Sequence, residues 1–412
     1  HAEEPDSIYN NDISVEINRL NLGELASVMP YLPPVSGILN ADFHIVEQDN
    51  QFSAVGMAEA RKFAYQGVEM GNLGAELSYQ PTKDGDHKAD AFITFNGTEV
   101  AEASGTYYAK GEGSFAGNVK LKSLPLSMMD AFLEGTQTKM KGALNGELSI
   151  VGTADKPVIN GTLTFDKAHL YSHVYGVDLT LASQPVEIHN SLIQLKDFAL
   201  TTVDGSPLKM SGVINMERPE AVFLNIDMIA KNFPAIDTKR KRESLVYGKV
   251  LTNFAANIYG TPSKMTVRGL LTVLDQTDVT YLLTNSPISS GSDISDLVTF
   301  TDFSDTLTAV APVQQQNSSS LNVALTIRLR QGARFQCFLT PNGDSYVDVS
   351  GEGNLELRMP PEGEMRLTGR LTLNEGKMNY ELPVIPLRTF TLAPGSYVEF
   401  TGKMMNPTLN IT

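Results

Sequence analysis

Apolar and polar residues alternate along most of the chain. Between residues 141 and 150 the apolar side chains fall on one parity, as Leu148 and Ile150 show. A period of two is the signature of a β-strand with one apolar and one polar face. A Gly/Pro-containing segment at 152–157 interrupts the pattern, which then resumes over 161–166. The stretch therefore predicts two half-buried strands joined by a turn.

This strand pair recurs at a nearly constant interval. Four copies begin at Gly37, Gly142, Gly248 and Gly353, which lie 105, 106 and 105 positions apart. A second strand in each copy begins at a further glycine: Gly56, Gly161, Gly269 and Gly369. A fixed period of this length predicts structural repeats that stack on one another into one elongated body without a single central core.

The pattern divides the chain into six segments. They are a leading strand and short helix (1–35), a first β repeat (36–123), a second (124–231), a third (232–283), a mobile Ser/Thr/Gln-rich insertion (284–320) and a C-terminal β repeat (321–412). Short amphipathic helices are expected within Leu20–Pro30 and Leu124–Leu133. The insertion is too polar to repay the entropy of ordering it by burying apolar surface.

Composition and charge narrow the function classes. The formal net charge of −15 argues against nucleic acid as a partner, because phosphate binding needs a basic surface. No run of about 18 apolar residues is present, so no membrane-spanning helix is expected within the chain. The first residue is His1 rather than Met, which fits a processed piece whose anchor lies outside it.

Candidate catalytic and metal-binding residues are few. His169 and His173 have a helical ligand spacing but lie in a strand-and-loop pattern without a third ligand, so no metal is expected. Cys337 shares parity with Phe335 and Leu339, which favours a buried thiol over a nucleophile. Neither a phosphate-binding loop nor a nucleophile elbow is visible. We expect no cofactor and no enzymatic activity.

One dense basic run interrupts the acidic chain. It consists of Lys239, Arg240, Lys241 and Arg242. The simpler interpretation is a solvated loop. The functional alternative is a contact with anionic lipid head groups or with an acidic partner.

A sheet with one apolar face must cover that face, and few helices are available here to do so. The sheet can close on itself or bend lengthwise into a trough with an apolar inner wall. A series of β-sandwiches or a filled β-solenoid gives the same alternation. Periodicity alone does not distinguish between these architectures.

The C-terminal sixty residues carry a more specific pattern. Its parts are the strand pair Gly369–Tyr380, the segment Phe390–Gly402 with its Pro-Gly-Ser turn, and the ending Asn406–Ile411, which begins Asn-Pro-Thr-Leu. This succession resembles the TamB C-terminal domain, of the AsmA-like group of bridge-type lipid transfer proteins. A more diffuse resemblance extends back to about residue 20.

The resemblance implies an all-β fold: an elongated, repetitive β-taco or trough, half-open, with an apolar concave groove. It implies a periplasmic location in a diderm bacterium, with an inner-membrane anchor helix outside this chain and membranes at the two ends of the full-length protein. The implied function is a conduit that moves phospholipids between the two membranes, together with an outer-membrane barrel of the TamA or BamA type.

The residues expected to contact acyl chains share the apolar parity of their strands. They are Leu144, Leu148, Ile150, Leu163, Phe165, Val323, Leu325, Ile327, Leu329, Leu355, Leu357, Leu371 and Leu373. Two other functions remain open. One is a chaperone or scaffold that pairs its edge strands with outer-membrane proteins during assembly and secretion. The other is a structural β-solenoid with a filled interior, in which the same residues are ordinary core.

Overall fold

The computed structural model describes residues 11–29, 34–48, 51–110, 113–133, 138–153, 155–218, 221–241, 244–282, 320–340, 343–362, 364–382, 385–393, 395–403 and 407–411. Strands account for 76% of the described residues, which confirms the all-β prediction. Both expected short helices are present, as the α-helix α1 (Leu22–Val28) and the 3₁₀ helix η1 (Leu126–Phe132). The expected insertion at 284–320 lies, apart from Ser320, outside the described residues.

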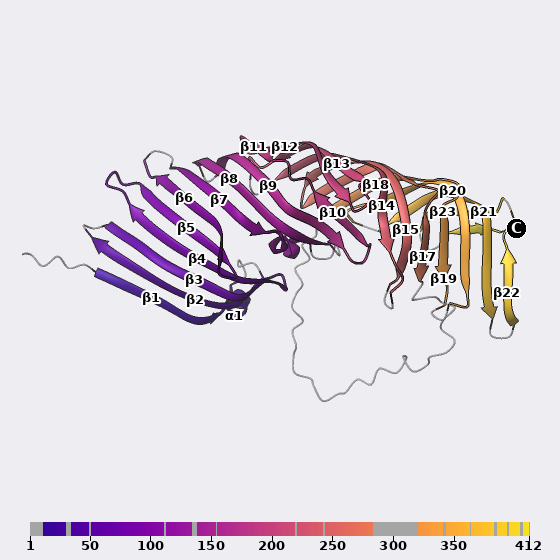
Figure 1. Cartoon of the computed structure of the whole chain (residues 1–412), viewed down its shortest axis with the longest axis horizontal. Helices are drawn as coiled ribbons and strands as arrows, with labels where there is room; N and C mark the ends of the chain where they lie inside the picture. Colours follow the sequence, from indigo (N-terminus) through magenta and orange to yellow (C-terminus); the bar gives the residue numbers. More distant parts are fainter. Residues whose placement is uncertain are drawn as a thin grey trace, which may run out of the picture. The chain divides into compact units, whose positions relative to one another are not determined.

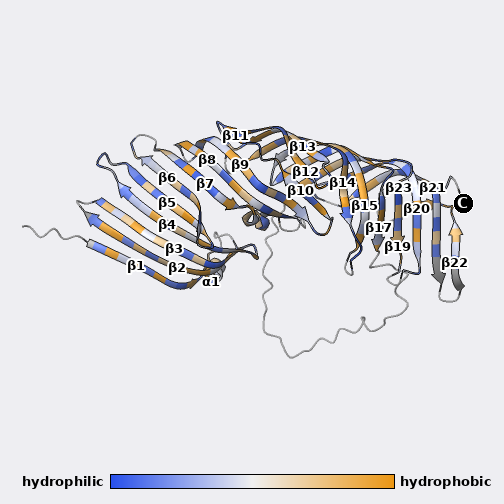
Figure 2. Cartoon of the chain, viewed as in Figure 1, coloured by the Kyte–Doolittle hydropathy of each residue, from blue (hydrophilic) through white to orange (hydrophobic). Residues whose placement is uncertain are grey.

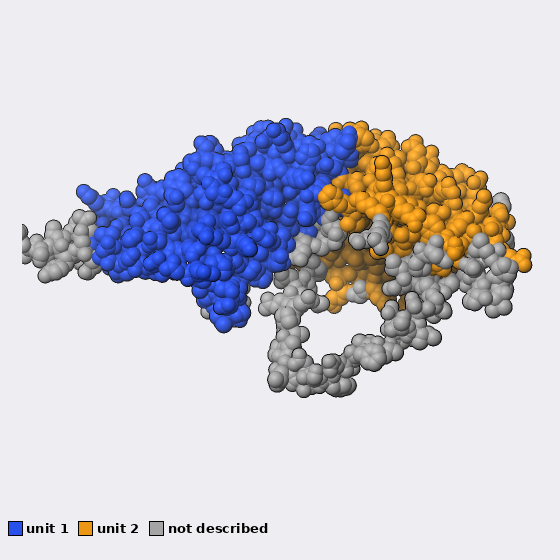
Figure 3. Space-filling view, turned by 60° about the horizontal axis from the view of Figure 1, so that its bottom comes forward, with its two compact units in different colours: residues 1–172, 178–203, 211–222 blue, residues 173–177, 204–210, 223–412 orange. Residues whose placement is uncertain are grey.

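The chain forms two compact units, coloured separately in Figure 3. Unit 1 comprises residues 1–172, 178–203 and 211–222, and unit 2 comprises residues 173–177, 204–210 and 223–412. The first strands are β1 (Asn11–Asn21), β2 (Val35–Gln48), β3 (Gln51–Tyr65), β4 (Val68–Pro81), β5 (His87–Phe95), β6 (Thr98–Tyr108), β7 (Ser114–Pro125), β8 (Lys139–Thr153), β9 (Lys156–Ser172), β10 (Val177–Leu181), β11 (Val186–His189), β12 (Leu192–Thr202) and β13 (Pro207–Asn215). Those that follow are β14 (Phe223–Thr238), β15 (Val246–Thr261), β16 (Lys264–Val273), β17 (Asp278–Leu282), β18 (Ser320–Leu329), β19 (Arg334–Phe338), β20 (Tyr346–Met359), β21 (Arg366–Leu382), β22 (Ile385–Thr391), β23 (Tyr397–Lys403) and β24 (Thr408–Asn410).

In unit 1, strands β1 to β9 form an antiparallel meander in which each strand pairs with the next (Figure 1). The predicted turn at 152–157 joins β8 to β9. Beyond β9, β11 pairs with both β9 and β12. Apolar and polar residues alternate along these strands as orange and blue bands in Figure 2.

Unit 2 mixes antiparallel and parallel pairs. Strand β15 pairs with β14, β16 and β17 in antiparallel register. Strands β16 and β18 are parallel, as are β17 and β19. Strand β20 then pairs along one half with β18 and along the other with β19. Periodicity did not predict the parallel pairs, because the alternation of faces is the same in either direction.

A recurring β-bulge bends the strands of both units. At each bulge two residues of one strand face a single Asn of the neighbour, and the second of the two has a positive φ. The four pairs of bulge residue and Asn are Arg19 and Asn40, Lys62 and Asn72, Ser123 and Asn145, and Asn232 and Asn253. In each pair the bulge N–H donates to the Asn side-chain oxygen, over 2.8–3.0 Å. Because a bulge bends its strand and increases the local twist, these positions set the curvature of the sheet.

Three of the four Asn residues follow the sequence period. Asn40, Asn145 and Asn253 lie 145 − 40 = 105 and 253 − 145 = 108 positions apart. The second-strand glycines also occupy equivalent places, since each faces one residue of the preceding strand: Gly56 faces Phe43, Gly161 faces Leu148, Gly269 faces Ala256 and Gly369 faces Leu355. The fourth copy differs from expectation. Gly353 faces Leu371 as Gly146 faces Leu163, so it corresponds to Gly146 rather than to Gly142.

The buried side chains of unit 1 gather at the β9–β12 end of its sheet. Ile188 and Phe198 are 2% and 4% exposed, and Phe165 packs edge-on against Phe198 with ring centroids 5.7 Å apart. Leu126 of η1 is also buried, and η1 packs against β8 and β4. The fully buried residues of β5 and β6, by contrast, are Val100 and Ala101. Large buried side chains therefore fill the β9–β12 end of the sheet, whereas the buried residues of β5 and β6 are smaller.

The Asn145 side chain gives a local test of the bulge bond. Replacing Asn145 with Ala removes the acceptor for the Ser123 amide, a bond worth about 0.5–1.5 kcal/mol. We expect amide hydrogen exchange of the peptide containing Ser123 to quicken by roughly fivefold. The Asn145→Asp variant keeps an acceptor oxygen and should exchange like the original chain. Unchanged exchange in Asn145→Ala would show that the side chain does not hold the bulge.

The close approach at Gly161 gives a second test. Gly161 has φ +151°, and a Cβ there would collide with the backbone oxygen of Glu147. In the β12–β13 turn Gly205 also has a positive φ, but no atom lies within 4 Å of its added Cβ. Overpacking costs about 1–3 kcal/mol, so Gly161→Ala should lower the thermal midpoint roughly 5 °C more than Gly205→Ala. The midpoints are measured by circular-dichroism melts. Equal decreases for the two variants would mean that the cost comes from the positive φ alone and not from the contact with Glu147.

Candidate functional site

One face of unit 1 carries apolar residues in continuous rows across its strands. Residues directly opposite one another in antiparallel strands lie on the same face. One row runs from β2 to β8 through Phe43, Gly56, Leu77, Ala91, Ala103, Val119 and Leu148. The adjacent row runs through Ile45, Ala54, Tyr79, Ala89, Gly105, Gly117 and Ile150. We call this surface the apolar face of unit 1.

A cavity of about 640 Å³ lies on the apolar face of unit 1. Its lining combines bulky residues, among them Phe43, Leu77 and Ile150, with alanines and glycines of β3, β5, β6 and β7. The small residues leave room that the bulky ones do not fill. Part of this surface is open, since Leu77 and Tyr107 are 43% and 47% exposed. Ligand pockets of roughly 300–1,000 Å³ are typically lined in this way.

Polar side chains stand at one end of the cavity. The Tyr79 hydroxyl lies 2.6 Å from Nδ1 of His87. The His87 ring stacks on that of Tyr79 at a centroid distance of 5.9 Å, and Tyr107 lies on its other side at 6.0 Å. His87 and Tyr107 face each other across β5 and β6. These three residues, which we call the Tyr–His–Tyr cluster, were not among the candidates from the sequence. Their shared parity near one strand end was the available signal.

The thirteen residues predicted to contact acyl chains lie on the apolar faces of the two units. Leu144 faces Phe165 in unit 1, and Leu325 faces Leu357 in unit 2. All are half-buried except Leu355 and Leu373, which are 8% and 2% exposed. Leu355 and Leu373 are thus core residues. Of the thirteen, Ile150 alone lines the cavity of unit 1.

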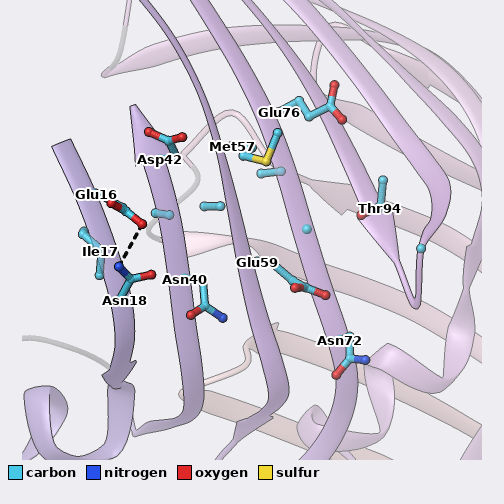
Figure 4. A pocket seen from close by; sticks show the side chains of 15 residues that line it. Glu16, Ile17, Asn18, Asn40, Asp42, Met57, Glu59, Asn72, Glu76 and Thr94 are labelled. Atoms are coloured by element: carbon cyan, nitrogen blue, oxygen red, sulfur yellow. Dashed lines mark hydrogen bonds between the residues drawn. The ribbon is translucent and has the colours of Figure 1, made fainter. Parts of the chain in front are cut away.

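The opposite face of unit 1 is polar. A second hollow, of about 340 Å³, lies there. Figure 4 shows side chains that line it, among them Glu16, Asp42, Met57, Glu59 and Glu76. Further along, Lys122 contacts Glu99, with 2.6 Å between Nζ and Oε1, and also contacts Glu102.

The contact between Lys122 and Glu102 is reflected in both pKa values. The hydrogen bond from Lys122 lowers the pKa of Glu102, and the hydrogen bonds to Glu102 and Glu99 raise the pKa of Lys122. Both groups are solvated, so they mark a water-facing surface.

The other sequence candidates offer little chemistry. Burial raises the pKa of the Cys337 thiol, which disfavours the reactive thiolate. His169 pairs with Asp178, with 2.9 Å between Nδ1 and Oδ1. Over the described residues, no group of three or more His, Cys, Asp or Glu is arranged to hold a metal ion.

The basic run lies between β14 and β15. Lys239, Arg240 and Lys241 are exposed there, whereas Arg242 is outside the described residues.

Within the described segments, every helix is too short or too polar to span a bilayer.

Comparison with known protein families gives a match. The model of the TamB C-terminal domain family matches residues 196–412, which is more than half of the chain. No curated protein and no solved structure matches. TamB proteins belong to the translocation and assembly module, act with a TamA-type outer-membrane partner, and span the periplasm from an inner-membrane anchor. The strand succession of residues 369–411 lies within the matched residues. The chain therefore belongs to the TamB family through its C-terminal domain.

Proposed function

We propose that this chain is part of a conduit that carries phospholipids between the inner and outer membranes of a diderm bacterium. Acyl chains would lie along the apolar faces of the two units, in the periplasm, and an outer-membrane barrel of the TamA or BamA type would be the partner. The observation that carries the proposal is the series of apolar cross-strand rows, half-exposed and hollowed into a cavity of about 640 Å³ in unit 1.

The energetics explain why such a face is useful. Moving a bare acyl chain of about sixteen carbons through water costs on the order of 12 kcal/mol, at about 0.8 kcal/mol per CH₂. A half-open apolar face removes much of that cost and leaves the charged head group in solvent. Rows of Leu, Ile, Val, Ala and Phe also bind without strong polar anchors, so a lipid is not held too tightly to move on.

The described side chains favour transport over catalysis. The apolar rows hold no pair of carboxylates, and the cysteine on the apolar side of β19 has a raised thiol pKa. The exposed Lys239–Lys241 loop supports a subsidiary role, contact with anionic head groups at a membrane surface.

Strand addition is the second candidate. Within the described residues β1 pairs with β2 alone, and its Ile13 and Val15 are 51% and 40% exposed. An edge strand of this kind can template a strand from another chain. A scaffold for outer-membrane protein assembly would use this edge and would not require lipid on the apolar faces.

A crosslinking pair separates the two functions. Leu325 is half-buried on the apolar face of β18, whereas its neighbour Thr326 is exposed and faces Glu356. With a photo-crosslinking residue at either position in cells, we expect phospholipid adducts at 325 and none at 326, read by mass spectrometry. A third variant carries the same crosslinking residue at Val15 of β1, and protein adducts there without lipid at 325 would favour the scaffold.

A charge on the apolar face should block transfer without unfolding the chain. The carboxylate of Leu325→Glu can reach solvent in the empty protein, but an acyl chain passing over it would desolvate the charge. We expect lipid transfer between donor and acceptor vesicles to fall at least about tenfold. Thr326→Glu places the same charge on the solvated face and should transfer normally. Equal rates for both variants, with intact circular dichroism, would contradict a lipid path over β18.

A further inference from the structure

We propose that the Tyr–His–Tyr cluster at the end of the unit 1 cavity binds the head group of a zwitterionic, amine-bearing phospholipid. The inference rests on the proposed transport function and names the lipid class that this part of the chain prefers. It comes from the position, chemistry and charge of the cavity lining.

The position of the polar atoms indicates an amphiphile. Asp90 lines the cavity but faces Ser78 and Ser104 across its neighbours, so its side chain belongs to the opposite face. On the apolar side, the lining residues with polar side chains are Tyr79, His87 and Tyr107, and they gather at one end. An apolar cavity with one polar end fits a ligand with a long apolar part and one polar head.

The chemistry of the cluster suits a phosphate beside an amine. When the Tyr79 hydroxyl donates to Nδ1 of His87, the imidazole carries its proton on Nε2, and that N–H can donate to a phosphate oxygen. Tyr107 is 47% exposed and offers an aromatic face to an ammonium group. Both halves of a phosphoethanolamine head group therefore have a partner within one cluster.

The charge of the lining selects against anionic lipids. None of the residues that line this cavity is Lys or Arg, and the formal net charge of the chain is −15. A lipid with a net negative head group would enter an unfavourable potential without a cation to offset it. A zwitterionic head group carries no net charge and keeps the aromatic contact, so the site discriminates by repulsion as well as by attraction.

The test measures which lipid the chain extracts. The purified chain is incubated with vesicles of equal parts phosphatidylethanolamine and phosphatidylglycerol with identical acyl chains, re-isolated and analysed by mass spectrometry. We expect phosphatidylethanolamine to be enriched about threefold over phosphatidylglycerol. In His87→Ala the ratio should fall toward one, keeping only the part that repulsion of the anionic lipid maintains, while total bound lipid stays within about twofold because the apolar cavity is retained.

Two further variants test whether the enrichment depends on the Tyr–His–Tyr cluster. His189→Ala removes an exposed imidazole of unit 1 that pairs with Glu187, away from the cavity, and should keep the enrichment. Tyr79→Phe keeps the ring but removes the hydrogen bond to His87, and should weaken the enrichment. This variant tests the cluster independently if His87→Ala fails to fold.

Bound lipid without any head-group preference, or enrichment that is undiminished in both His87→Ala and Tyr79→Phe, overturns the head-group site alone. Absence of bound lipid from the unmodified chain overturns the transport function as well.

Discussion

The strand bulges are the constraint on which the rest of the structure depends. With few helices available to cover it, a one-sided antiparallel sheet can shield its apolar face by curving, and each bulge adds a residue that increases the local bend. That extra residue also has a backbone N–H without a ladder partner. At Ser123 and Asn232 the side-chain oxygen of an Asn on the next strand accepts this bond, over 2.8 Å in both cases. The curvature is therefore built from a local hydrogen bond that each copy can repeat.

Glycine has a complementary role on the apolar face. Where Gly161 faces Leu148, the absence of a Cβ lets the two backbones approach closely and leaves the leucine side chain room. Around β5 and β6, alanines and glycines occupy the same rows, and the space they leave is the cavity of unit 1. Near β9 to β12, by contrast, Ile188 and Phe198 fill the face. One pattern of alternation thus produces a packed core in one place and an open hollow in another.

The difference between filled and open parts of the apolar face matters for lipid transport. A uniformly filled face would leave no space for an acyl chain, and a uniformly open one would lack the packing that holds the sheet together. Residues such as Leu325 and Ile327 remain half-buried, whereas Leu373 is core. In the proposed conduit the large residues stabilise the sheet, the small ones make room for lipid, and the polar cluster at Tyr79 and His87 favours one kind of head group.

The sequence by itself determined the strands, their faces and the family. A period of two reports which side chains share a face whatever the strand pairs with, and the succession from Gly369 to Ile411, which resembles the TamB domain, lies within the residues that match this family. Only the tertiary structure decided the parallel pairing of β16 with β18, the correspondence of Gly353 with Gly146, and the cavity with its Tyr–His–Tyr cluster. These features depend on register and on the sizes of neighbours from different strands. A single strand's alternation carries no information about them, because each is a property of residues far apart in sequence.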